Sequence, residues 1–121
     1  MSAEVSRRAL AEMIEGARAL GLAVFLAGPA PVHDLEQNRR TQSLSRSFAE
    51  TCQERGARCC ATVEALLASP TWMAEVARAD GAHPGTDGYD APAALLIDEG
   101  LRTWLVEPIA AKPAAANVAA R

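Results

Sequence analysis

Several features that mark familiar protein classes are scarce in this 121-residue sequence. Its aromatic residues are two phenylalanines, two tryptophans and one tyrosine, so a core must be built mostly from Leu, Val, Ile and Ala. No apolar run approaches the roughly 18 residues of a transmembrane helix, so no membrane span is expected. The net charge of −3 is small and both signs are interspersed. That pattern lacks the basic stripe of a nucleic-acid-binding protein, so no nucleic-acid partner is expected.

Cysteine is also scarce, and the chain has only Cys52, Cys59 and Cys60. The number is odd and no Cys-x-x-Cys motif occurs, so neither a disulfide framework nor a zinc site is expected. Free cysteines are often small buried apolar residues, and we expect these three to be buried thiols in a reducing cytoplasm. The N-terminal stretch "MSAEVSRRALAEMIEG" is charged and helical in pattern, unlike a signal peptide.

Apolar residues recur at helical spacing in two stretches, which predicts helices over 3–20 and about 36–55. A glycine follows each helix, as is typical of helix ends. The run "LAVFLAG", 22–28, is continuously apolar and predicts a parallel strand buried on both faces. Residues 58–63 form a second candidate strand.

Two further helices are expected in the second half of the chain. Ser69 followed by Pro70 is a common helix start and predicts a helix that holds Trp72 and Val76. A last helix carries the apolar residues between 95 and 105. Pro92 lies early in it, so we expect a kink there or a restart with Asp90 as the cap.

The alternation of helices and strands predicts an α/β fold, a parallel sheet with helices on both faces. Two strands are fewer than the usual four to six, and an apolar sheet edge invites association. We therefore expect residues 1–106 to be the C-terminal part of a larger domain. Residues 107–121 lack periodicity and are expected to be a disordered tail.

The stretch "RADGAHPGTDGY" admits two interpretations. A histidine that acts as a general base needs a partner for its second ring nitrogen, and Asp80 stands three residues before His83. Gly81 permits a sharp turn that brings the two together. The same residues also suit a surface turn with capping residues ahead of a helix. Residue spacing alone leaves both interpretations open.

The block "DGAHPGTDGY" resembles the last sequence block of the GDSL (SGNH) esterases and lipases, which is roughly D-x-x-H-P followed by glycine and an aromatic residue or histidine at the start of the final helix. Asp80, His83, Pro84, Gly88 and Tyr89 match this block. The resemblance extends over most of residues 3–106. "AVFLAGPAPV" is similar to the fourth strand of the family with its G-P-P loop, "NRRTQSLSRSFAETCQERGA" to the following helix, and "SPTWMAEVARADGAHP" to the segment before the catalytic turn.

This resemblance implies a flavodoxin-like, three-layer SGNH hydrolase fold and an acylhydrolase activity on small-molecule esters. It implies that Asp80 orients His83, that His83 activates a serine, and that no cofactor is needed. The family's serine lies in a G-D-S block, and none of the six serines here follows Gly-Asp or sits in G-x-S-x-G. Asn38 and Asn117 do not lie in the family's G-x-N-D block. The chain is thus expected to supply only the acid and base, and it is an enzyme only together with a missing N-terminal half.

The alternative is a non-catalytic remnant or interaction module, which pairs with itself or with a partner through an exposed strand edge. His33 follows the first strand, and ligands of doubly wound folds bind beyond the carboxyl ends of strands. His33 is therefore a candidate substrate-binding residue, and a solvated loop histidine is the other reading. A metal site made of His33, Asp80 and His83 is not expected, because their spacing matches no known ligand pattern.

Overall fold

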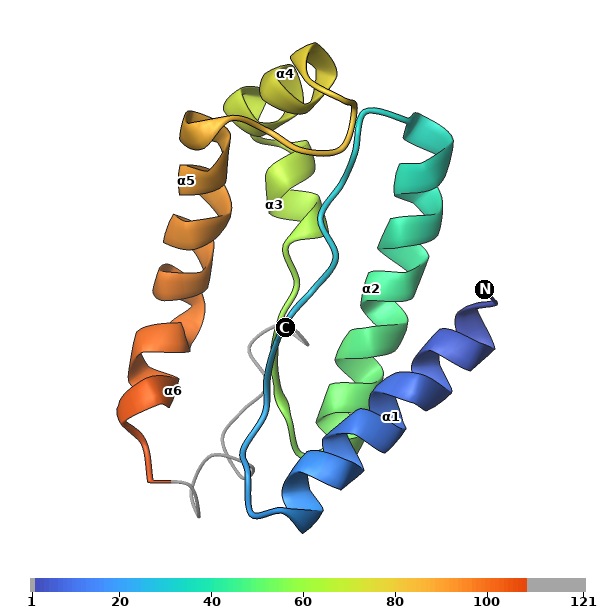
Figure 1. The fold of residues 1–121 in the computed structure, drawn as a ribbon, viewed down its shortest axis with the longest axis vertical. Helices are drawn as coiled ribbons and strands as arrows, with labels where there is room; N and C mark the ends of the chain where they lie inside the picture. The colour runs from blue at the N-terminus through green and yellow to red at the C-terminus, as the bar shows by residue number, and fades with distance from the viewer. Residues whose placement is uncertain (1, 109–121) are drawn as a thin grey trace.

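A two-stranded parallel sheet lies between helices in the computed structural model, which describes residues 2–108 (Figure 1). Strand β1, Phe25–Ala27, pairs with strand β2, Arg58–Cys60, with Leu26 opposite Cys59. Helices α1, Ala3–Ala19, and α2, Leu35–Arg55, lie to one side of the strands in Figure 1, and helix α5, Thr86–Leu96, lies to the other. The predicted α/β arrangement, with parallel strands between helices, is therefore confirmed, although the chain is rich in helix and the sheet is small.

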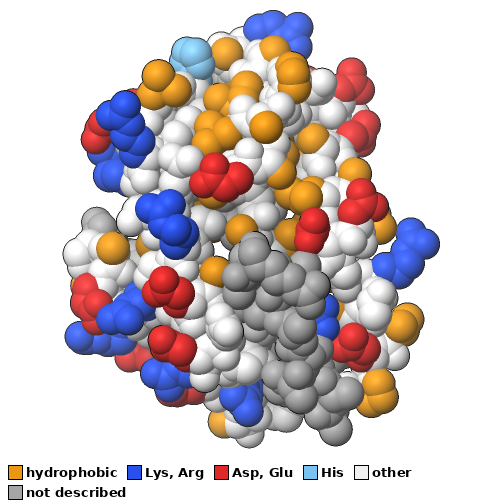
Figure 2. Space-filling model, turned by 180° about the vertical axis from the view of Figure 1, so that it is seen from behind, with side chains coloured by type: hydrophobic (Ala, Val, Ile, Leu, Met, Phe, Trp, Pro, Cys, Tyr) orange, Lys and Arg blue, Asp and Glu red, His pale blue; other side chains and the backbone are white. Residues whose placement is uncertain are grey.

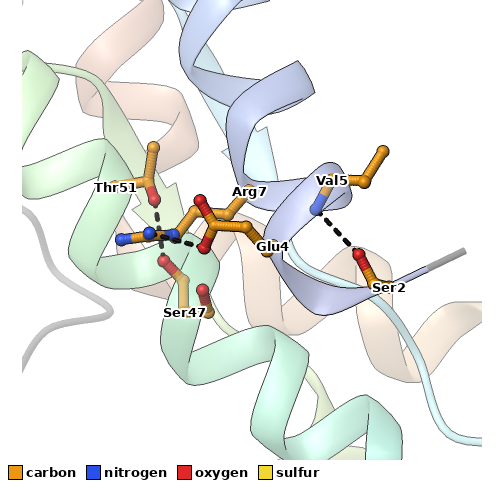
Figure 3. A network of polar contacts seen from close by, with 6 residues as sticks. All are labelled: Ser2, Glu4, Val5, Arg7, Ser47 and Thr51. Atoms are coloured by element: carbon orange, nitrogen blue, oxygen red, sulfur yellow. Dashed lines mark hydrogen bonds and ion pairs between the residues drawn. The ribbon is translucent and has the colours of Figure 1, made fainter.

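Each of the two long helices starts directly after a residue whose side chain caps it. The Ser2 hydroxyl accepts a hydrogen bond from the Val5 amide at the start of α1, and Arg7 pairs with Glu4 in the same turn (Figure 3). The Asp34 carboxylate caps α2 by accepting from the Gln37 amide. These bonds satisfy amides that have no partner inside a helix. The predicted helices over 3–20 and 36–55 are confirmed to within one residue at each end.

The first strand differs from its prediction. It spans three residues instead of the predicted 22–28, and it is not buried on both faces. Phe25 and Leu26 are partly exposed and Ala27 is exposed, whereas every residue of β2 is buried. Both strands are edges of the described two-stranded sheet, so the difference comes from what covers each one: β2 places Cys59 inside the buried cluster with α1 and α2, whereas Leu26 of β1 packs only partly buried against that cluster.

Two apolar clusters hold these elements together. One joins α1 and α2 to β2 and contains Leu10, Ile14, Cys52 and Cys59, all nearly inaccessible to solvent. All three cysteines are buried free thiols, as predicted. The other joins α3, Val63–Leu67, to α4, Pro70–Arg78, through Leu66, Trp72 and Val76.

Helix α4 starts as predicted, while the last helix does not break where predicted. The Ser69 hydroxyl accepts from the Trp72 amide, with Pro70 as the first helical residue. Helix α5 continues through Pro92, so the expected restart with Asp90 as the cap does not occur. The irregularity falls one turn later, in a π-helical segment η1, Ile97–Leu101, where Gly100 has a φ of 112°. Because proline has no backbone N–H, α5 lacks the one hydrogen bond that an amide at residue 92 would donate.

The chain then continues into α6, Arg102–Val106, which returns to the sheet. The Trp104 ring meets the Phe25 ring edge-on at a centroid distance of 5.4 Å. A Glu107 oxygen lies 3.5 Å from the buried Arg58 guanidinium. From residue 109 onward, the predicted disordered tail lies outside the described residues.

Surface properties differ between the two ends of the molecule. On the face turned away from the viewer of Figure 1, hydrophobic side chains gather in the upper half and charged ones are more frequent below (Figure 2). Among the described residues, no helix combines the length and apolar character required to cross a membrane.

Candidate acid–base site

The turn that links α4 to α5 brings Asp80 and His83 into direct contact. One Asp80 oxygen, Oδ1, accepts hydrogen bonds from the amides of Ala82 and His83 at 2.9 and 2.8 Å. The other, Oδ2, lies 2.7 Å from Nδ1 of the His83 ring. A single carboxylate therefore holds both the backbone of the turn and the imidazole, which is the arrangement that the sequence predicted for an acid–base pair.

These contacts determine the charge state of Asp80. The hydrogen bond from His83, followed by those from the Ala82 and His83 amides, holds the pKa of the Asp80 carboxyl well below its usual range. An ionised carboxylate only accepts hydrogen bonds, so Nδ1 must be the donor in the 2.7 Å contact. In neutral His83 the proton then sits on Nδ1, and Nε2 carries the free lone pair. A general base needs that tautomer.

The backbone of the turn depends on Gly81. Its φ of 87° lies in the left-handed region, which favours glycine. The Gly81 amide donates to the Val76 carbonyl at 2.9 Å and so closes the end of α4. Its carbonyl accepts from the His33 amide at 2.7 Å, which joins the turn to the loop after β1.

Close contacts at the start of α5 leave no room for a side chain at Gly85 or Gly88. Gly85 is the N-cap and the helix begins at Thr86, so Pro84 lies just before the helix. A Cβ at Gly88 would lie only 2.4 Å from Pro84 Cβ, and one at Gly85 would lie 2.6 Å from the Glu75 carboxylate. Helix α5 can approach the proline after His83 because Gly88 lacks a side chain.

Sequence reasoning missed the part played by Glu75. Its carboxylate lies against Gly85 and close to Gly88, at the N-terminal end of α5, which has no side-chain cap of its own. Negative charge is favourable at that end of a helix. Tyr89, the last residue of the block, meets Trp72 edge-on at 5.9 Å and ties α5 to α4.

The structure places His33 beside the acid–base turn. Its backbone bonds to Gly81, and its Cβ lies 3.8 Å from the place that a Gly81 Cβ would take. Both therefore lie at the carboxyl end of β1, the end at which ligands of parallel sheets bind. The His33 side chain is exposed, and the residue is joined to the turn through its backbone amide rather than through a ring hydrogen bond between described residues.

Buried polar side chains hold the His33 loop rigid, and the sequence did not reveal them. The Asn38 side chain accepts from the Val32 amide at 2.7 Å and donates to the Val32 carbonyl at 2.8 Å. The Trp72 indole donates to the Pro31 carbonyl at 3.1 Å, and the Thr62 hydroxyl donates to the Gly28 carbonyl. Asn38 is only 3% exposed, so its partners are fixed. An asparagine in the first turn of a helix after a proline-rich loop was the available signal.

A nucleophile is not part of this arrangement. Within residues 2–108, no serine hydroxyl is hydrogen-bonded to His83, whose ring bonds to Asp80 through Nδ1. Ser2 and Ser69 cap helices, and Ser45 is buried on α2. The described chain therefore brings together an acid and a base without the third member of a triad.

The pair also lies open to solvent. The Asp80 and His83 side chains are 60% and 71% exposed. The nearest hollow has a volume of about 220 Å³ and is lined by Glu75, Arg78, Ala79 and Gly85. Larger hollows of about 370 and 440 Å³ lie along α2, away from the turn. Among the described residues, no cluster of three or more His, Cys, Asp or Glu side chains is arranged to bind a metal ion.

No family model matches this chain, and no curated protein or solved structure matches it. The resemblance of residues 80–89 to the GDSL block thus stays a prediction from the sequence. The structure adds the geometry of the turn, in which the matched residues contact one another or the neighbouring helix α4.

Proposed function

We propose that Asp80 and His83 are the acid and base of an ester hydrolase of the GDSL/SGNH type, whose nucleophilic serine lies outside the described residues. The observation that carries this proposal is the 2.7 Å contact between Asp80 Oδ2 and His83 Nδ1, with Oδ1 tied to two amides of the same turn. A capping aspartate needs only the amide contacts. The additional contact with the ring selects a tautomer, which matters for proton transfer.

In this proposal His83 moves protons through Nε2. Nε2 takes the proton of a serine hydroxyl as its oxygen attacks the ester carbonyl, and returns it to the departing alcohol. A water molecule, deprotonated by the same nitrogen, then attacks the acyl carbonyl; the carboxylic acid is released, and Nε2 returns the proton to the departing serine oxygen. Asp80 stays ionised throughout and stabilises the imidazolium that forms in each step. The reaction needs no cofactor.

The finer fold proposal follows from the same resemblance. Helices on both sides of β1 and β2 suit the C-terminal part of a flavodoxin-like, three-layer domain of the SGNH type. Further parallel strands would then continue the sheet beyond β1. His33, which lies beside the turn, would line the mouth of the pocket for a small-molecule ester. A cytoplasmic location agrees with three free, buried thiols.

Hydrolysis of a short p-nitrophenyl ester tests this proposal. The 121-residue chain alone should show no serine-dependent turnover, whereas a longer protein that includes a Gly-Asp-Ser block encoded upstream of Met1 should hydrolyse the ester. In that longer protein, His83→Ala should lower kcat by about 10³-fold or more, as expected for a triad member. Asp80→Ala should cause a comparable or smaller loss, because it removes only the orienting partner. Near-normal turnover by the His83→Ala variant would contradict the assignment.

The second candidate function is a non-catalytic module that pairs through a strand edge. The observation in its favour is the exposure of β1, where Ala27 is exposed beside a fully buried β2. Absence of any Gly-Asp-Ser block upstream, together with measurable association, would favour this candidate over the hydrolase.

A further inference from the structure

One edge of the sheet has unused backbone groups. The Arg58 amide donates to the Val24 carbonyl at 3.1 Å, and the Gly28 amide donates to the Cys60 carbonyl at 2.8 Å. In a parallel ladder, alternate residues bond to the same neighbour, so Leu26 also faces β2. The amides and carbonyls of Phe25 and Ala27 therefore point to the opposite edge, where no residue of the described chain bonds to them.

Among the described residues, this edge carries no charged side chain, although its length of three residues limits any pairing to a short contact. Natural edge strands are protected by charged side chains, by a covering segment or by a bulge. Residues 19–32, which contain β1, have no charged side chain. Leu20 and Leu22, which lead into the strand, are 78% and 54% exposed. Both leucines lie within the segment that joins the end of α1 to β1.

We infer that the open edge of β1 binds the same edge of a second copy of this chain, in an antiparallel arrangement about a two-fold axis at Leu26. In that arrangement Phe25 lies opposite Ala27 of the second copy, and both residues present their amide and carbonyl outward. Residues opposite each other in this way exchange both backbone hydrogen bonds. The two-fold axis repeats the exchange between Ala27 and Phe25 of the second copy.

The side chains favour a second copy over an unrelated strand. The large Phe25 ring would meet a small and exposed alanine, and Leu26 would meet its own counterpart on the other face of the sheet. The strand is thus complementary to itself, as a closed two-fold interface requires. The product is a four-stranded sheet, β2–β1–β1–β2, with its central pair antiparallel.

This inference concerns the 121-residue chain by itself, because in the longer protein of the hydrolase proposal further strands would occupy the same edge of β1. In antiparallel pairing the carboxyl ends of the two β1 strands point in opposite directions. The two Asp80–His83 turns then lie at opposite ends of the dimer, where pairing leaves them open. Association is measured on the 121-residue chain and turnover on the longer protein, so failure of the dimer and failure of the hydrolase proposal are distinguishable.

Sedimentation equilibrium of the 121-residue chain tests the inference, with Ala27→Lys as the variant. Ala27 is exposed in the single chain, so lysine should leave its fold unchanged, while in the dimer it places a charge beside Phe25 of the second copy. We expect a dimer for the native chain and a dissociation constant at least ten-fold higher for Ala27→Lys. The matched control is Ala77→Lys, on the exposed surface of α4, which should dimerise like the native chain.

Amide exchange gives a second readout with residue resolution. In the dimer the amides of Phe25 and Ala27 should be protected as well as those of Leu26 and Gly28. In Ala27→Lys the Phe25 amide should exchange freely, while those of Leu26 and Gly28, which bond to β2, stay protected. A native chain that is monomeric at all concentrations, or a dimer that Ala27→Lys does not weaken, would overturn the inference.

Discussion

The substitution Gly88→Ala probes how closely α5 packs against the acid–base turn. The added Cβ would lie 2.4 Å from Pro84 Cβ, 3.2 Å from Pro84 Cγ and 3.4 Å from Glu75 Cδ. Glu75 has rotamers with which to move away, but the proline ring has none. Overpacking typically costs about 1–3 kcal/mol, and we expect the upper end here. Alanine recovers about 1 kcal/mol of helix propensity, which leaves a net loss of about 2 kcal/mol.

Gly16→Ala is the matched control for that substitution. Gly16 lies within α1, and no atom lies within 4 Å of the place its Cβ would take. The same change should therefore stabilise the protein by about 0.5–1 kcal/mol. Urea unfolding followed by tryptophan fluorescence, at one protein concentration, measures both differences. If Gly88→Ala were as stable as the native protein, the close approach of α5 to Pro84 would be wrong.

Three other predictions concern the same region. Because the pKa of Asp80 is lower in the folded chain than its unfolded value near 3.9, its ionised form stabilises the fold above about pH 4. Asp80→Asn should thus melt below the native protein at pH 7, with a gap that closes as the pH falls under 4; a constant gap would contradict this. Asn38→Ala should cost about 2 kcal/mol in urea unfolding and speed amide exchange at His33, since it leaves the partly buried amide and carbonyl of Val32 without their side-chain partners; unchanged exchange at His33 would show that the loop is held otherwise. A fluorophosphonate probe should label none of the six serines of the 121-residue chain, as mass spectrometry would detect, and stoichiometric labelling of any one would reveal a missed nucleophile.

Local chemistry made much of this fold predictable. The ends of α1 and α2 and the start of α4 depend on a capping side chain, a glycine or a proline within a few residues, so the sequence around each end carries its cause. The Asp80–His83 contact was predictable for the same reason, because the two residues share one turn.

Other features depend on residues far apart in the sequence. Strand β1 was expected to be buried on both faces, but an apolar strand is buried only where neighbours exist to cover it. The hydrogen bond between His33 and Gly81 links loops from different parts of the chain, and Asn38 and Trp72 hold the first loop in place. Nothing in the local sequence shows that the two loops meet. The helix through Pro92 was mispredicted because tertiary packing outweighs the loss of one hydrogen bond.

The tautomer of His83 tests most directly the claim that Asp80 and His83 form a poised acid–base pair. Nitrogen-15 NMR of the labelled 121-residue chain, recorded at a pH where the ring is neutral, distinguishes the two ring nitrogens. The account predicts a proton on Nδ1 and a free lone pair on Nε2, and it predicts that Asp80→Asn removes this preference. A ring protonated on Nε2, or a tautomer ratio that Asp80→Asn leaves unchanged, would contradict it.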